Sequence, residues 1–193
     1  LSPRLKVYKL LRTFRSALGS YINTFQKSQN PTKHSCCFLP SLLPYEINNS
    51  FFDVVHIHWV QSEMISIEGI GKIKKPKIMT LHDCWAFSGS EHFPLNLEDK
   101  RYKEGYFKGN KNINYKGLDL DRWCWNRKRK RWNIPFQLVA PSHWMETMAK
   151  DSALMKDWPI TVIPNPLPTN IYKPFDKLLA RNLFELPKDK KLI

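Results

Sequence analysis

Two short apolar runs constrain the fold of this chain more than any other feature. Residues 53–60 read DVVHIHWV and residues 77–85 read KIMTLHDCW, and each is a strand-like run in which histidine is followed closely by tryptophan. Further apolar runs at 136–140 and 160–164 alternate with helix-like segments. Alternating strands and helices build a parallel sheet, so we predict an α/β fold with a Rossmann-like parallel sheet and helices on both faces.

The spacing of apolar residues and the positions of Gly and Pro predict the individual elements. An amphipathic helix, capped at Ser2 and weakened at Gly19, is expected from residue 3 to about residue 25. The polar stretch 86–119 is too long for a simple connector and is typical of a functional or mobile loop. We expect strands at 54–59, 77–82, 136–140 and 160–164, helices at 65–74, 121–132 and 143–156, and one helical turn at 45–49.

Charge and cysteine content narrow the choice of partner and compartment. The net charge of +14 favours an anionic partner: a phosphorylated small molecule, a phospholipid surface or nucleic acid. The 4 cysteines form no C-x-x-C pair, so they support neither a disulfide framework nor a structural zinc site. The sequence shows no membrane-spanning run and no secretory signal, so we predict a cytoplasmic protein. The basic face of the N-terminal helix has two interpretations. We prefer an ordinary face exposed to solvent, and the alternative is a face that binds peripherally to a membrane.

Polar residues follow each predicted strand. His58 and Trp59, His82 and Asp83, Ser142, and Asn165 are expected on one edge of the sheet, because ligands of open parallel sheets bind outside the carboxyl ends of the strands. Two imidazoles and a carboxylate suit proton transfer and the stabilisation of a positive centre. We therefore prefer a functional role for His58 and a core role for His56, its neighbour on the same strand face.

The remaining candidates have competing structural explanations. Trp59 and Trp85 either stack on a sugar or fill the core, and both interpretations stay open. Capping of a helix is a sufficient explanation for Ser142. The basic helix RWCWNRKRKRW (122–132) is expected to be capped by Asp121. Its Trp125 and Trp132, seven residues apart, predict core contact, and with no nucleic-acid module in the sequence a nucleic-acid partner is disfavoured.

The runs DVVHIHWV, KPKIMTLHDCWAFSGSEHF, LVAPSHWM and VIPNPLPTNIYKPFDK, in this order and spacing, resemble the N-terminal domain of glycosyltransferase family 4. The similarity covers roughly residues 38–193, and it is strongest to members that build bacterial surface polysaccharides and lipopolysaccharides. It implies a GT-B architecture, in which two Rossmann-like domains face each other across a cleft. On this basis residues 1–165 are the acceptor domain, and residues 166–193 are a linker and the start of the donor domain.

The resemblance also implies an activity. Such enzymes are hexosyltransferases that move a sugar from a nucleotide-sugar donor to a saccharide or lipid-linked acceptor, with retention of configuration and without an essential metal or other cofactor. His58 falls where relatives carry a histidine beside the reacting sugar, and it is the expected catalytic residue. The expected substrate-binding residues are Trp59, His82, Asp83, Trp85, His92, Ser142 and Asn165.

The chain departs from the family pattern in three places. It reads GSEHF where relatives often have Gly-Gly-Cys-His, and PNPLP where Asn-Gly-Ile-Asp is more usual. The glycine-rich loop near the donor phosphates would lie before Leu1, so this chain alone is expected to turn over no substrate. The alternative function is a non-catalytic basic α/β module that binds polyanions or nucleic acid.

Overall fold

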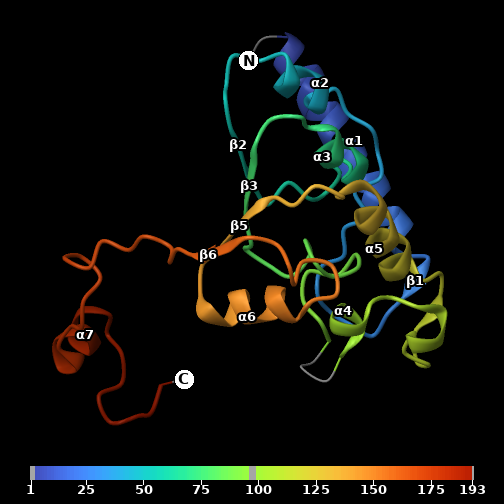
Figure 1. The fold of residues 1–193 in the computed structure, drawn as a ribbon. Helices are drawn as coiled ribbons and strands as arrows, with labels where there is room; N and C mark the ends of the chain where they lie inside the picture. The colour runs from blue at the N-terminus through green and yellow to red at the C-terminus, as the bar shows by residue number, and fades with distance from the viewer. Residues whose placement is uncertain (1–2, 96–98, 193) are drawn as a thin grey trace.

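The computed structural model describes residues 3–95 and 99–192, with a four-stranded parallel sheet at its centre (Figure 1). The strands are β2 (Val55–His58), β3 (Lys77–Thr80), β5 (Gln137–Ala140) and β6 (Ile160–Val162), and they lie in this order across the sheet. The register pairs His58 with Thr80 and Thr80 with Val139. All four predicted strands are confirmed, each shorter by one to two residues at one or both ends.

Three helices connect the strands and cover one face of the sheet: α3 (Ile67–Lys72), α5 (Leu120–Arg131) and α6 (His143–Asp151). The order of the strands across the sheet is the same as their order along the chain. Right-handed crossovers therefore place every connecting helix on the same side of the sheet. The covered face carries Ile57, Met79 and Leu138, which are all buried in the main core.

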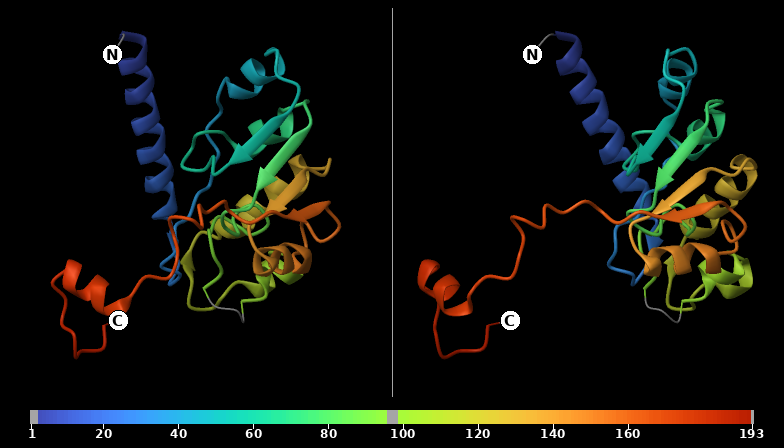
Figure 2. Two further views of the ribbon diagram at one scale, coloured as in Figure 1. Left: turned by 90° about the vertical axis from the view of Figure 1, so that its left-hand side faces the viewer. Right: turned by 60° about the vertical axis from the view of Figure 1, so that its left-hand side comes forward.

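The prediction of helices on both faces is wrong for the described residues. Figure 2 (left) looks onto the second face, and no described helix lies over the strands in this view. His56, His58 and Thr161 are exposed there, because successive residues of a strand point to opposite faces. The structure is therefore α/β with a Rossmann-like sheet of which one face is open in the sense that no described helix covers it.

The N-terminal helix α1 (Pro3–Asn23) projects from the sheet and packs through its C-terminal half (Figure 2). Arg15 donates to the carbonyl oxygens of Leu39, Pro40 and Glu63 at 2.7–3.0 Å. Gly19, predicted as a weak point, is instead a close contact: a Cβ at this position would lie 2.6 Å from Glu63 Cγ. The predicted cap Ser2 lies outside the described residues.

The stretch 86–119 is a packed segment rather than an open loop. It contains α4 (Arg101–Glu104), a 3₁₀ turn at Lys108–Asn110, and β4 (Lys116–Gly117), which pairs antiparallel with β1 (Gln26–Lys27). Four of its aromatic side chains, Phe87, Tyr102, Tyr106 and Tyr115, are buried, whereas Phe93 and Phe107 are exposed. The predicted turn near 45–49 is α2 (Leu43–Asn48).

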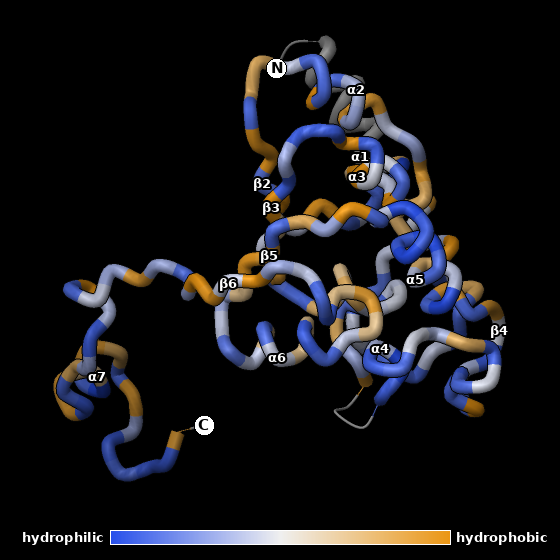
Figure 3. The backbone as a smooth tube through the Cα atoms, in the orientation of Figure 1, coloured by the Kyte–Doolittle hydropathy of each residue, from blue (hydrophilic) through white to orange (hydrophobic). Residues whose placement is uncertain are grey.

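Helix α5 differs from its prediction at its start and along its basic face. Its N-cap is Asp119, which accepts a hydrogen bond from Arg122 N at 3.1 Å, and not Asp121. Trp125 and Trp132 are buried, as predicted. Lys128 is also buried, so the basic run is not a continuous surface, although Figure 3 colours much of the α5 backbone as hydrophilic.

Beyond β6 the chain leaves the sheet and forms α7 (Lys177–Leu183) apart from it (Figure 1). Among the described residues, no helix combines the length and the apolar composition needed to cross a lipid bilayer.

Candidate functional site

The carboxyl ends of β2 and β3 bring three histidines together. His58 Nδ1 lies 2.9 Å from His82 Nε2, and the rings of His56 and His58 have centroids 4.0 Å apart. His56 Nε2 is 2.8 Å from Thr80 Oγ1, so this ring is held against the sheet. The predicted meeting of His58 and His82 on one edge is therefore present, and both rings are exposed.

His58 is electrostatically tuned by its surroundings. Partial burial lowers its pKa below the usual 6.5, and the neighbouring rings of His56 and His82 lower it further. Two neutral imidazoles joined by one N–H···N hydrogen bond keep one N–H donor and one acceptor nitrogen that are not used in that bond. The lowered pKa keeps His58 neutral near pH 7, so a lone pair or an N–H of the pair is available to a hydroxyl ligand.

Asp83 is the organising carboxylate of this edge. Its Oδ2 accepts a hydrogen bond from Trp59 Nε1 at 3.0 Å and lies 2.7 Å from His92 Nδ1. Its Oδ1 accepts from the backbone N–H of Trp85 at 3.0 Å. On the far side of the ring, His92 Nε2 is 2.9 Å from Ser35 Oγ. The two neighbours of His92 fix both the orientation and the tautomer of its ring.

Trp59 is held in an unusual backbone conformation. Its φ is +37°, in the left-handed region that bulky residues rarely adopt. The hydrogen bond to Asp83 anchors the indole, and the ammonium of Lys33 lies 4.3 Å from its ring centroid. The side chain is 43% exposed, so part of the indole remains open to a ligand. Because Lys33 already covers one ring face, any ligand that stacks on the indole has to use the remaining exposed part.

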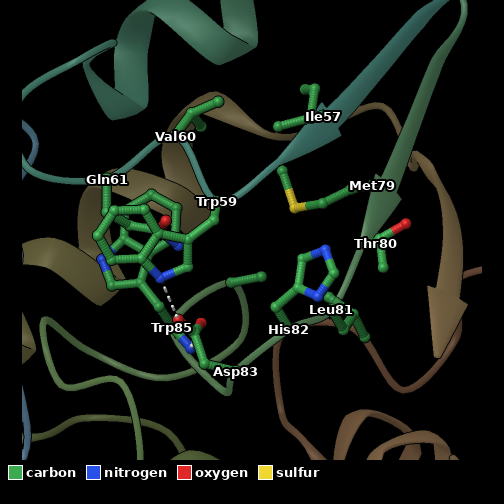
Figure 4. Close-up of a pocket in the computed structure, with 11 residues that line it drawn as sticks. Ile57, Trp59, Val60, Gln61, Met79, Thr80, Leu81, His82, Asp83 and Trp85 are labelled. Carbon is green, nitrogen blue, oxygen red and sulfur yellow. Dashed lines mark hydrogen bonds between the residues drawn. The ribbon is translucent and has the colours of Figure 1, made fainter. Parts of the chain in front are cut away.

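A small pocket lies between these residues and the end of β3 (Figure 4). Trp59, Met79, His82 and Asp83 are among the residues that line it, and Figure 4 shows the Trp59 indole directed at the Asp83 carboxylate. Its volume is about 10 Å³, roughly the space of one water molecule. A ligand larger than water would therefore contact the exposed edge formed by His58, Trp59 and His82, here called the rim, and not the inside of this pocket.

Two predicted contact residues are closed off from solvent. Trp85 is 1% exposed and donates from Nε1 to Ser35 O at 2.8 Å, and His92 is 4% exposed between Asp83 and Ser35. Of the two interpretations of Trp85, core filling is thus the correct one. Neither ring is placed to touch a substrate directly. The His92 ring and the backbone N–H of Trp85 hold Asp83 in place.

Ser142 and Asn165, which follow β5 and β6, make no hydrogen bond to the histidine pair among the described residues. Ser142 caps α6 by accepting a hydrogen bond from Met145 N at 3.2 Å, which was the structural explanation for its position. Asn165 is exposed in the segment through which the chain leaves the sheet. The candidate site is therefore centred on β2 and β3 and draws His58, Trp59, His82 and Asp83 from the predicted set.

Sequence reasoning missed Lys128 as a support of this site. Its side chain is fully buried, and its ammonium donates to the carbonyl oxygens of Trp85, Ser88 and Gly89 in the loop after β3. The ammonium also lies 4.1 Å from the centroid of the Trp85 ring. Burial lowers its pKa from 10.5 to about 8. Lys128 was missed because it lies within a run of basic residues that is typical of an exposed face, whereas its own side chain points inward.

The chain was also compared with known proteins. No family model matches it, and neither the curated proteins nor the solved structures show a match to it.

Proposed function

We propose that this chain is the acceptor-side domain of a nucleotide-sugar-dependent glycosyltransferase. The enzyme would transfer a sugar, with retention of configuration, to a polysaccharide or lipid-linked saccharide acceptor. One observation carries the proposal: the exposed pair of His58 and His82, 2.9 Å apart, lies at the carboxyl edge of β2 and β3. That edge is where open parallel sheets bind ligands.

The chemistry assigned to His58 follows from its protonation state. Glycosyl transfer passes through a transition state with oxocarbenium character, which needs an oriented acceptor hydroxyl and electron-rich groups nearby. A neutral imidazole can accept a hydrogen bond from that hydroxyl, and its lowered pKa keeps it neutral. His82 fixes the His58 ring through the 2.9 Å contact. The proposed reaction uses the nucleotide-sugar as donor and no metal or other cofactor in the transfer step.

The saccharide would meet the rim at Trp59. The exposed part of its indole offers an apolar surface beside the imidazole pair, and aromatic rings contact the C–H faces of sugars favourably. The Asp83 carboxylate holds this indole in place by accepting the hydrogen bond from its Nε1. Trp59 is thus assigned to acceptor binding and Asp83 to positioning.

A peripheral membrane contact is part of the proposal because of the charge. At the C-terminal end of α5 the side chains of Arg129, Lys130 and Arg131 are exposed, and the chain carries a net charge of +14. Each exposed cation near an anionic bilayer contributes about 1 kcal/mol to binding. Co-sedimentation with phosphatidylserine and with phosphatidylcholine vesicles tests this: binding is expected only to the former, and equal binding to both contradicts it.

The alternative of a nucleic-acid or polyanion module is less well supported. In α5, Lys128 is buried, and Arg127 pairs with Glu68, with Arg127 Nε 2.7 Å from Glu68 Oε1. Only part of the basic run therefore faces solvent. A filter-binding assay with single-stranded and duplex DNA and RNA should show weak, strongly salt-dependent retention without sequence preference.

The decisive experiment compares His58→Ala with His143→Ala in the enzyme that includes the donor-side domain. Release of nucleoside diphosphate is measured with a panel of sugar nucleotides and saccharide acceptors. His58→Ala is expected to lower turnover by about 10²-fold or more. His143 is exposed at the start of α6, where its ring contacts Glu146 and not the histidine pair, and its replacement should leave turnover unchanged. Equal turnover of the two variants would refute the assignment of His58.

A further inference from the structure

A second cluster of ionisable side chains lies behind the rim, around His34, Glu91 and Asp121. His34 and Glu91 face each other in an antiparallel bridge. The flanking hydrogen bonds, Ser35 N to Ser90 O at 2.7 Å and His92 N to Lys33 O at 2.9 Å, make this a non-hydrogen-bonded pair. In such a pair the two side chains approach more closely than at any other register position.

Asp121 completes the cluster from the first turn of α5. Its Oδ1 lies 3.4 Å from His34 Nδ1. One nitrogen or oxygen atom from each of the three residues can be chosen so that all lie within 4.8 Å of one another. Glu91 and Asp121 are each 4% exposed, so two carboxyl groups converge in a place that water hardly reaches.

Few hydrogen-bond donors serve the Glu91 carboxyl group. The hydrogen bonds that described residues make to Glu91 come from Gly89 N and the Tyr106 hydroxyl, and no described Lys or Arg donates to either carboxyl group. Glu91 Oε2 is buried and receives no hydrogen bond from the described residues.

Gly89 makes room for the convergence. A Cβ at this position would lie 2.5 Å from Asp121 Cβ and 2.6 Å from Glu91 Oε2. Any other residue would push the carboxyl groups apart. Only glycine, which has no Cβ, lets the backbone at position 89 come this close to Glu91 and Asp121.

We propose that His34, Glu91 and Asp121 bind one divalent transition-metal ion of the zinc class. One imidazole with two carboxylates is a donor set that Zn²⁺ accepts, with bonds of about 2.0–2.2 Å. Tetrahedral coordination with such bonds separates neighbouring ligand atoms by about 3.3–3.6 Å, and the observed separation of His34 Nδ1 and Asp121 Oδ1 is 3.4 Å. Water would supply the fourth ligand.

Polar groups surround the cluster, and the Ser90 hydroxyl contacts His34 Nδ1 at 3.1 Å and donates to Asp121 Oδ1. Gln26 Nε2 donates to Asp121 Oδ2 at 2.7 Å, and Ser90 N donates to Asp121 Oδ1 at 3.2 Å. Gly89 N donates to Glu91 Oε1 at 3.2 Å. Hydrogen bonds of this kind orient ligating carboxylates. The ion would join the segment near β1, the segment after β3 and the start of α5, and its role is structural, independent of the proposed transfer reaction.

The test uses the full chain, stripped with a chelator and then dialysed against ZnCl₂ or CoCl₂. Elemental analysis is expected to find one metal per chain, and the cobalt form is expected to show the intense visible absorption of a tetrahedral site. Zinc should raise the melting temperature by about 5–10 °C at 100 times the dissociation constant. Glu91→Gln and His34→Asn should each lower metal affinity at least 10-fold. The control, Asp157→Asn at an exposed position, should keep the wild-type affinity.

Two results would overturn the proposal. One is a wild-type chain that takes up no stoichiometric metal and gives no cobalt absorption, which leaves a carboxyl pair sharing a proton. The other is a folded Glu91→Gln variant that binds zinc as tightly as the wild type. Because the cobalt spectrum is recorded on the wild type, the test stands even if a variant fails to fold.

Discussion

Asp83 is the residue whose replacement should most disturb the rim. Its two oxygens serve three donors: Trp59 Nε1 at 3.0 Å, His92 Nδ1 at 2.7 Å and Trp85 N at 3.0 Å. Asp83→Asn preserves the shape of the side chain but leaves only one acceptor oxygen. Whichever way the amide turns, at least one of these donors then faces an NH₂ group.

The cost can be worked out from these contacts. A buried donor without an acceptor costs about 1–3 kcal/mol, and the loss of charge weakens the remaining hydrogen bonds by about 1 kcal/mol. We expect Asp83→Asn to lower the free energy of unfolding by about 3 kcal/mol. For a chain of this length that corresponds to a fall of about 6–12 °C in melting temperature.

Urea unfolding followed by tryptophan fluorescence measures this loss. Asp157→Asn, an exchange of the same chemistry at an exposed position, should change the free energy of unfolding by less than about 0.5 kcal/mol. A double-mutant cycle with Trp59→Phe isolates the indole bond and should give a coupling of about 1 kcal/mol. If Asp83→Asn is as stable as the control, the carboxylate does not organise this edge and the reasoning fails.

Three further predictions concern His58, Lys128 and Gly19. In an NMR titration His58 should protonate below pH 6.5, because burial and the neighbouring imidazoles lower its pKa. The unfolded chain then takes up the proton first, so stability from this group is complete above pH 6.5 and falls at lower pH; a midpoint above 6.5 would contradict this. Lys128→Met should cost about 3 kcal/mol in urea unfolding, since it strips the donor from three buried carbonyl groups. Because burial lowers the pKa of Lys128 to about 8, wild-type stability relative to this variant should rise between pH 8 and 10.5, and a flat difference would argue against it. Gly19→Ala should destabilise by about 1–2 kcal/mol despite the better helix propensity of alanine, because the added Cβ would lie 2.6 Å from the Cγ of buried Glu63; a stabilised variant would show that Glu63 moves aside.

The sequence predicted the strands and the helix-strand order because these depend on local apolar periodicity. Ile57 and Met79 lie in runs whose composition is enough to identify a buried strand. The meeting of His58 and His82 was also predictable, since parallel strands deliver their carboxyl ends to one edge. Local pattern and general topology together therefore located the candidate site.

The sequence could not predict contacts that depend on which face of an element turns inward. The run of basic residues in α5 conceals Lys128, which the packing of the loop after β3 draws into the core. The capping role passed from Asp121 to Asp119 because the helix begins at Leu120, one residue earlier than predicted. The open face of the sheet was missed because an apolar strand composition does not specify the direction in which successive crossovers advance.

The rim and the buried cluster are two sides of one extended pairing. His34 and Glu91 pair in an isolated antiparallel bridge. His34 and Glu91 turn toward Asp121, while their neighbours Ser35 and His92 turn toward Asp83, with Ser35 Oγ 2.9 Å from His92 Nε2. A shift of the backbone at this bridge would move both groups together. The position of Asp83, and with it the Trp59 indole, therefore depends on how well the three-residue cluster behind it is held.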